Sequence, residues 1–229
     1  KSPAWLAAYC VPAGELPFPN ICLRISTGVS FTTVLCFGGR PVPRALAAIP
    51  RADITEPADV DAATVGVSRA VVLGTEADLA TVLTRLLRAD RLAVEVAHLP
   101  GSRGARRALR AGAQRVPLIR DETGTVLVRR ALWRPAPEGR LLEGEGIVDD
   151  TVLFDGAVAG VAVEPTHTMP GLRARVLGSG WRSGPWVSGR AAQLGTPAAV
   201  VVRDGVAAPR PVRRSTCYRH IEGWLRVTV

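Results

Sequence analysis

The stretch that decides the fold is residues 70–79, Ala-Val-Val-Leu-Gly-Thr-Glu-Ala-Asp-Leu, which is followed by a leucine-rich run. The apolar residues 71–73 end at Gly74, which predicts a buried strand that leads into a tight turn. The apolar residues that follow recur at the spacing of one helix face: Leu79, Val82, Leu83, Leu86 and Leu87. The sequence therefore predicts a strand, a turn and an amphipathic helix in direct succession.

A second strand and turn follow this helix. Residues 93–97 predict the strand, and Pro-Gly-Ser at 100–102 predicts the turn. Thr75 can cap the intervening helix together with Asp78, in a capping box that has Asp in place of Glu or Gln. A strand, a crossover helix and a second strand predict a parallel pair. Both turns then lie at the carboxyl ends of strands, where open α/β sheets bind their ligands.

An arginine-rich segment begins directly after the second turn. Its arginines fall at helical spacing on one face: Arg103, Arg106, Arg107 and Arg110. Two interpretations stay open, an exposed helix face and a binding surface for an anionic partner, because like charges this close repel one another. The formal net charge of +9 is consistent with both, and with a genomic bias toward arginine.

The residues before this unit predict more of the α/β part. Residues 21–25 and 31–37 predict two strands, and residues 44–49, which lie between prolines, predict a short helix. Gly-Gly-Arg at 38–40 predicts a plain turn, with an anion-binding turn as the alternative.

From residue 115 onward the pattern favours strands. Residues 116–120 and 125–128 predict a hairpin with a four-residue loop. The Asp-Gly pairs at 155–156 and 204–205 predict two further hairpins, because Asp-Gly suits the turn that joins two antiparallel strands.

The fold class predicted from these patterns is α/β plus all-β. Residues 173–177 and 223–229 add two strands to the later part. We predict an α/β domain over residues 1–114, followed by a mainly antiparallel β domain over residues 115–229.

Composition limits the remaining possibilities. The chain has 229 residues, of which 47% are hydrophobic and 21% charged, which is typical of a globular protein and excludes global disorder. No apolar run is long enough to span a bilayer and no signal peptide is visible, so we expect a cytoplasmic protein, with peripheral membrane attachment left open. Because the first residue is Lys1, a removed N-terminal segment also stays open. Buried thiols are predicted for the four cysteines, Cys10, Cys22, Cys36 and Cys217. No metal site is predicted, because the three histidines are scattered: His98, His167 and His220.

The pattern around residues 70–110 resembles the diacylglycerol kinase family of lipid kinases, whose wider fold is shared with NAD kinases. Family members carry Gly-Gly-Asp-Gly-Thr between a strand and a helix, and later a strand that ends in Pro-x-Gly-Thr-x-Asn-x-x-Ala. Here Gly-Thr-Glu-Ala-Asp at 74–78 stands in the first position, and Pro-Gly-Ser-Arg-Gly-Ala-Arg-Arg-Ala at 100–108 stands in the second. The order, the spacing and the α/β-then-β layout agree with the family.

The resemblance implies a lipid kinase that uses ATP and Mg²⁺, a phosphotransferase whose catalysis is chiefly positioning and charge neutralisation. Glu76 keeps an acidic side chain in the first motif, and in a catalytic role Glu76 or Asp78 would help to hold Mg²⁺. The turn residues that would contact the nucleotide are Gly74, Thr75, Gly101, Ser102 and Arg103.

Several positions depart from the family pattern. Thr75 and Ala77 replace glycines, and their Cβ atoms are expected to crowd a bound phosphate. The second motif has no Asn, and the Asp-Gly pairs at 155 and 204 lack the Glu that follows Asp-Gly near the C-terminus of family members. These departures predict that phosphoryl transfer is impaired or lost, in which case Glu76 and Asp78 would only favour the helix dipole.

Two alternatives to a lipid kinase-like enzyme stay open. Whether the chain forms a homo-oligomer also stays open. A non-catalytic binding or scaffold protein on the same fold would recognise an anionic lipid, a nucleotide or a protein partner. Its candidate contacts are the helical arginines and a Trp- and Arg-containing loop over 178–190: Arg106, Arg107, Arg110, Trp181 and Arg182. A nucleic-acid-binding protein is the other alternative, suggested by the arginines and tyrosine of residues 210–220, although no recognised nucleic-acid motif is present.

Overall fold

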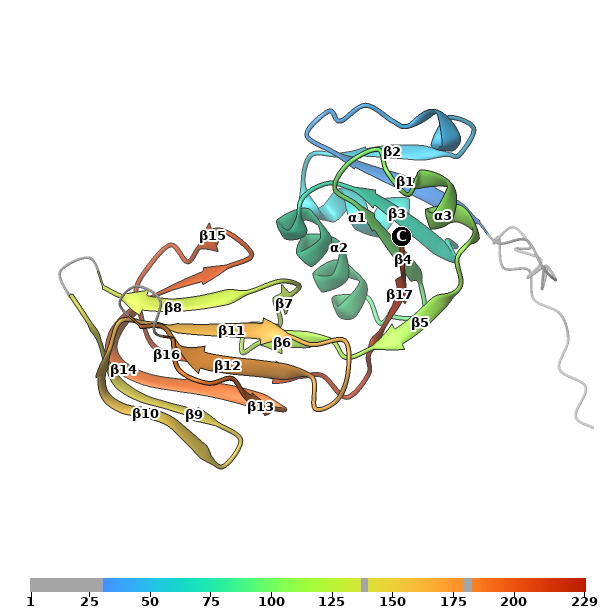
Figure 1. The fold of residues 1–229 in the computed structure, drawn as a ribbon. Helices are drawn as coiled ribbons and strands as arrows, with labels where there is room; N and C mark the ends of the chain where they lie inside the picture. Colours follow the sequence, from blue (N-terminus) through green and yellow to red (C-terminus); the bar gives the residue numbers. More distant parts are fainter. Residues whose placement is uncertain (1–30, 137–139, 179–182) are drawn as a thin grey trace, which may run out of the picture.

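The structure, a computed structural model, describes residues 31–136, 140–178 and 183–229. Its strands form a six-stranded sheet that carries the helices and an eleven-stranded antiparallel sheet beside it (Figure 1). The predicted combination of an α/β part and an all-β part is confirmed. The strand predicted at 21–25 lies outside the described residues.

The six-stranded sheet has the order β2-β1-β3-β4-β17-β5. Its strands pair in parallel, except that β5 pairs antiparallel with β17. The strands are β1 (Thr32–Phe37), β2 (Arg51–Ile54), β3 (Arg69–Leu73), β4 (Glu95–Leu99), β5 (Ala113–Val116) and β17 (Trp224–Val227). The helices are η1 (Arg44–Leu46), α1 (Pro57–Ala63), α2 (Glu76–Arg88) and α3 (Ala105–Arg110).

The predicted unit of strand, helix and parallel strand is confirmed as β3, α2 and β4. Strand β4 begins two residues later than predicted, because the Val94 N–H still donates to the Arg91 carbonyl in the turn after α2. The helix predicted at 44–49 is shorter and consists of the 3-10 turn η1.

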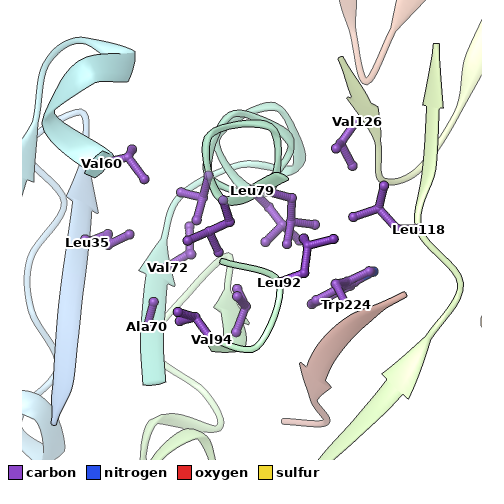
Figure 2. Close-up of a cluster of buried hydrophobic side chains, with 14 of the residues drawn as sticks. Leu35, Val60, Ala70, Val72, Leu79, Leu92, Val94, Leu118, Val126 and Trp224 are labelled. Carbon is purple, nitrogen blue, oxygen red and sulfur yellow. The ribbon is translucent and has the colours of Figure 1, made fainter. Parts of the chain in front are cut away.

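Helix α2 is held by the apolar face that its sequence predicts. Four of the five predicted positions are buried, and Leu87 is half-buried against the same cluster. The cluster extends from β1 and β3 through α2 to Leu118, Val126 and Trp224, which lie beyond the helix (Figure 2). Burial of a leucine side chain stabilises a protein by about 1.5–3 kcal/mol, so this face fixes α2 both to the sheet and to the start of the second sheet.

The eleven-stranded sheet spans residues 119–219. Its first strands are β6 (Ile119–Asp121), β7 (Val126–Leu127), β8 (Ala131–Pro135), β9 (Leu142–Val148), β10 (Thr151–Val158) and β11 (Val161–Pro165). The remaining strands are β12 (Leu172–Val176), β13 (Val187–Gly189), β14 (Ala191–Arg203), β15 (Val206–Ala207) and β16 (Val212–Arg219). A second core lies within this sheet around the fully buried Trp133.

Two of the three predicted hairpins are confirmed. Strands β6 and β7 form the first, and β14 and β15 turn at Asp204-Gly205, where both residues have a positive φ. The hairpin predicted at 155–156 is wrong, because β10 runs through these residues without a turn. The turn lies instead at Asp149, which has a φ of 51° and accepts hydrogen bonds from the backbone N–H groups of Arg190 and Ala191.

The last strand returns to the first sheet. Strand β17 lies between β4 and β5, although residues 223–229 were predicted as part of the β domain. The chain therefore passes between the two sheets twice, and the predicted boundary at residue 114 falls inside β5.

None of the helices in the described part of the chain is long and apolar enough to cross a membrane. Cys36 and Cys217 are free, buried thiols, and burial raises the pKa of Cys217 to about 12; Cys10 and Cys22 lie outside the described residues.

Candidate functional site

A cavity of about 430 Å³ lies where the two sheets meet. Its wall includes residues from α2, β4, the segment between β7 and β8, the turn after β11, and β17. The polar and aromatic side chains that line it are Glu76, His98, Arg129, Thr166, His167, Trp224 and Arg226. Of the predicted site residues that the structure describes, only Glu76 lines this cavity.

The first turn of α2 is closed by its own side chains. The Asp78 carboxylate accepts hydrogen bonds from the Thr75 backbone N–H at 2.7 Å and from the Thr75 hydroxyl at 2.9 Å. The Asp78 N–H in turn donates to the Thr75 hydroxyl oxygen, which completes the predicted capping box. A Cβ atom at Gly74 would lie only 2.6 Å from an Asp78 carboxylate oxygen, so this carboxylate lies directly against the Gly74 backbone.

Helix α1 begins in almost the same way. The Asp59 carboxylate accepts hydrogen bonds from the Thr55 N–H at 2.8 Å and from the Glu56 N–H at 2.9 Å. Because two unrelated helices share this arrangement, the Asp78 contacts are those of an ordinary N-terminal cap.

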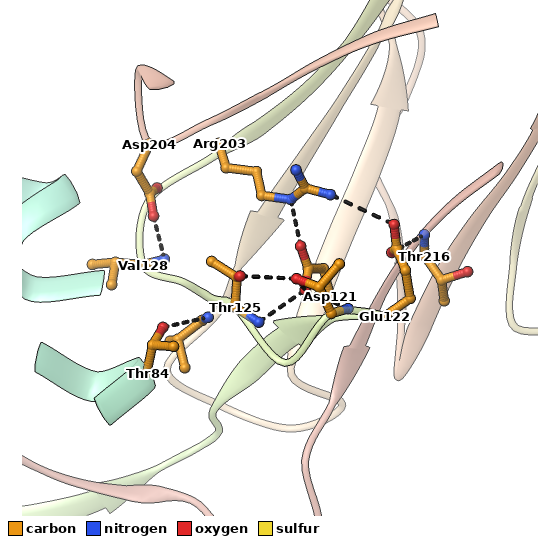
Figure 3. Close-up of polar contacts among 10 residues, drawn as sticks. Thr84, Asp121, Glu122, Thr125, Val128, Arg203, Asp204 and Thr216 are labelled. Atoms are coloured by element: carbon orange, nitrogen blue, oxygen red, sulfur yellow. Dashed lines mark hydrogen bonds and ion pairs between the residues drawn. The ribbon is translucent and has the colours of Figure 1, made fainter. Parts of the chain in front are cut away.

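Glu76 faces the cavity and forms an ion pair with Arg129 at 3.4 Å. The Arg129 backbone is fixed by Asp204, whose carboxylate accepts hydrogen bonds from the N–H groups of Val128, Arg129 and Arg130 at 2.7–2.9 Å. Figure 3 shows the bond to Val128. Burial raises the pKa of Asp204, although these three hydrogen bonds oppose the shift. Asp204 therefore holds the segment that carries Arg129 beside α2.

Further polar contacts near this point join α2 to the second sheet and connect residues within that sheet. The Thr84 hydroxyl on α2 accepts a hydrogen bond from the Val126 N–H at 2.9 Å. In the second sheet, Arg203 forms ion pairs with Asp121 at 2.7 Å and with Glu122 at 3.6 Å (Figure 3). The Thr84 contact places α2 against β7, whereas the Arg203 ion pairs lie within the second sheet.

The second predicted turn lies away from the cavity lining. Gly101, Ser102 and Arg103 are exposed, and a Cβ atom at Gly101 would meet no neighbour. The turn is tied instead to the Gly-Gly-Arg turn, since Arg40 donates to the Pro100 carbonyl at 2.8 Å. Helix α3 follows with Arg106, Arg107 and Arg110, which are exposed, while Arg103 precedes the helix.

The structure adds three cavity residues that the sequence did not indicate as a group. The His98 ring donates from Nε2 to the Gly74 carbonyl at 3.0 Å, because a carbonyl oxygen can only accept. Arg226 on β17 donates to His167 Nδ1 at 3.1 Å. Partial burial of the imidazole and the neighbouring Arg226 both lower the pKa of His167. His167 and Arg226 are far apart in the sequence and match no motif, so only the fold brings them together.

Two aromatic residues of the β part, Trp186 and Tyr218, are covered by arginines. The guanidinium groups of Arg173 and Arg175 lie 4.2 and 4.4 Å from the centre of the Trp186 ring. Arg120 covers Tyr218 at 4.6 Å. Each stacked arginine covers an aromatic face that a partner or a nucleic-acid base would otherwise use. Trp181 and Arg182 lie outside the described residues.

Comparison with solved structures shows the fold. A diacylglycerol kinase from Bacillus anthracis str. Sterne superposes with a TM-score of 0.66 at 11% identity, over 89% of this chain and 98% of that chain. An NAD kinase from Archaeoglobus fulgidus, solved in complex with ATP, gives a TM-score of 0.60 at 11% identity, over 86% of this chain and 93% of that chain. No protein-family model and no curated protein sequence matches this chain. The chain thus has the two-domain fold of diacylglycerol kinases and NAD kinases, as the resemblance implied.

Proposed function

We propose that this chain is a non-catalytic binding protein on a lipid kinase-like fold, in which ATP-dependent phosphoryl transfer has been lost. The observation that carries this proposal is the position of the Asp78 carboxylate. It accepts the hydrogen bonds of the first turn of α2 and lies against Gly74, where the family resemblance would place a nucleotide phosphate. A phosphate at this turn would meet a negative charge and would find the Thr75 N–H already paired.

The side chains near the cavity also do not fit Mg²⁺. This ion takes oxygen ligands, chiefly carboxylates and waters, at near-ideal octahedral geometry. Asp78 is engaged in the cap and Glu76 is paired with Arg129. Within the described residues, no group of three or more His, Cys, Asp or Glu side chains could hold a metal ion.

The hairpin between β14 and β15 supports the same proposal. In the family resemblance, a glutamate follows Asp-Gly and lies close to the transferred phosphoryl group. Here Val206 stands at that position and is 61% exposed, while Asp204 is bound to three backbone N–H groups. Neither residue supplies a carboxylate for positioning the reacting groups.

A lipid kinase assay tests the proposal directly. We expect no phosphorylated product from diacylglycerol in mixed micelles with ATP and Mg²⁺, with a catalytically active diacylglycerol kinase as the positive control. Thermal unfolding with ATP should give the same midpoint with and without Mg²⁺, whereas a ligand at a hundredfold its Kd would add about 2.7 kcal/mol to stability. A lipid product, or an Mg²⁺-dependent ATP stabilisation, that disappears in Glu76→Ala would overturn the proposal.

A further inference from the structure

Arg226 is a cation in the cavity that has no acidic side chain as a partner among the described residues. It lies on β17, is half-buried, and contacts His167. Within the described ranges, no carboxylate forms an ion pair with it. Other arginines of the two sheets do have acidic partners: Arg130 and Arg173 share Glu164, and Arg115 pairs with Glu222. A partly desolvated guanidinium without a counter-charge is unfavourable, so an anion bound beside it would be stabilised.

The hydrogen-bonding state of His167 shows which donors remain. Its Nδ1 accepts from Arg226, so the neutral ring carries its proton on Nε2. Within the described part of the chain, this Nε2–H group and the remaining N–H groups of Arg226 make no other hydrogen bond, so they can donate to a ligand. A guanidinium fork beside a second N–H donor suits an oxyanion with several acceptor atoms.

The charges on the opposite side of the cavity do not cancel this preference. Arg129 and Glu76 form a long, exposed ion pair, with side chains 70% and 40% exposed. Arg129 and Arg226 together outnumber Glu76 among the charged side chains that line the cavity. The volume of about 430 Å³ is in the range of sites for small molecules.

We propose that this cavity binds a small phosphate-bearing ligand, with its phosphate group between Arg226 and His167. A phosphate group has enough acceptor oxygens to take hydrogen bonds from both side chains at once, whereas a carboxylate has fewer. The inference deepens the proposed function, because it names the ligand class of a binding protein whose α2 turn does not accept phosphate. The ligand can be a free phosphate, a soluble phosphate ester or a lipid headgroup, which share this chemistry.

Titration with simple probes at constant ionic strength tests the inference. The full chain is titrated with inorganic phosphate, glycerol 3-phosphate and acetate, without ATP or Mg²⁺, and binding is followed by calorimetry and thermal shift. We expect saturable binding of the phosphate probes, and binding at least tenfold weaker in Arg226→Gln. Arg213→Gln is the matched control, because it removes the same charge from an exposed position on β16 that does not line the cavity, and it should bind within twofold of the unchanged protein.

A second variant protects the test against a folding defect. His167→Ala removes the other predicted donor from an exposed turn, and it should also weaken phosphate binding while unfolding cooperatively. Equal losses in Arg213→Gln and Arg226→Gln, tighter binding of acetate than of phosphate, or no saturable binding would each overturn the inference. Vesicles with phosphatidic acid distinguish the sources: binding to vesicles that depends on Arg226 identifies a lipid headgroup, and tighter binding of glycerol 3-phosphate than of phosphate identifies a soluble ester.

The two proposals can fail separately. An active lipid kinase whose phosphate binding without Mg²⁺ still depends on Arg226 would overturn the proposed function and leave the phosphate site in place. An inactive chain that binds no phosphate probe would overturn the phosphate site and leave the proposed loss of kinase activity in place.

Discussion

The two sides of the cavity differ in how their charges are satisfied. On the α2 side, Asp78 is bound within its own helix turn, and Glu76 has a partner in Arg129. On the β17 side, Arg226 has a neutral histidine as its contact and no carboxylate within the described chain. A bound anion adds little stability at a turn whose charges are already paired. It is stabilised beside a guanidinium that has no acidic partner. The proposed phosphate site therefore lies on the β17 side of the cavity and not at the α2 turn.

The two sides also differ in how the chain builds them. The α2 side comes from five consecutive residues, 74–78, and from hydrogen bonds between near neighbours. The β17 side requires the last strand to insert between β4 and β5, and the turn after β11 to lie beside it. Trp224 anchors that strand in the same apolar cluster as α2 (Figure 2). The β17 side therefore depends on long-range packing.

Replacing the Trp224 anchor is expected to have the largest effect. Trp224 is 8% exposed and belongs to the core, so Trp224→Ala should lower the free energy of unfolding by about 3–5 kcal/mol. Trp186→Ala is the matched control, because Trp186 is half-buried and held by arginine stacking, which contributes about 0.5–1 kcal/mol at exposed sites. Urea denaturation of both variants measures the difference, and equal losses would show that Trp224 does not anchor β17.

A smaller effect is expected from Glu164, which supports the turn that carries His167. Burial opposes its ionisation, but hydrogen bonds from Arg173 and Arg130 outweigh burial and hold the pKa of Glu164 below its usual value. A carboxyl group with a lowered pKa in the folded state stabilises the protein above its unfolded pKa, and this stabilisation is lost as the pH falls through the folded pKa. Glu164→Gln should therefore cost about 2 kcal/mol at neutral pH.

The pH dependence distinguishes this ion-pair effect from a simple packing defect. The gap in unfolding free energy between Glu164→Gln and the unchanged protein should narrow as the pH falls below the usual pKa of a glutamate, about 4.3. Denaturation curves recorded from neutral to acidic pH provide the measurement. A gap that stays constant across this range would mean that the carboxylate charge does not stabilise the turn.

Sequence reasoning succeeded where neighbouring residues decide the structure. The strand, cap and helix of residues 69–88 follow from an apolar run, a capping box and a helical period, all of which are local. The Asp-Gly pair at 155–156 misled the prediction, because the turn is fixed at Asp149 by hydrogen bonds from Arg190 and Ala191. The pairing of Arg226 with His167 could not be predicted, since it depends on where β17 inserts.

The α2 side provides the smallest expected effect and the sharpest test of the comparison. Asp78→Ala removes the hydrogen bonds to Thr75 and should cost about 1 kcal/mol of stability. Asp59→Ala removes the equivalent contacts from α1 and is the matched control, with a lowered melting temperature of its own. Because the Asp78 carboxylate occupies the place of a phosphate, we expect a new phosphate-dependent stabilisation in Asp78→Ala that is absent in Asp59→Ala. If neither variant gained phosphate binding, both carboxylates would be only caps, and the charge of Asp78 would not be what keeps phosphate from the α2 turn.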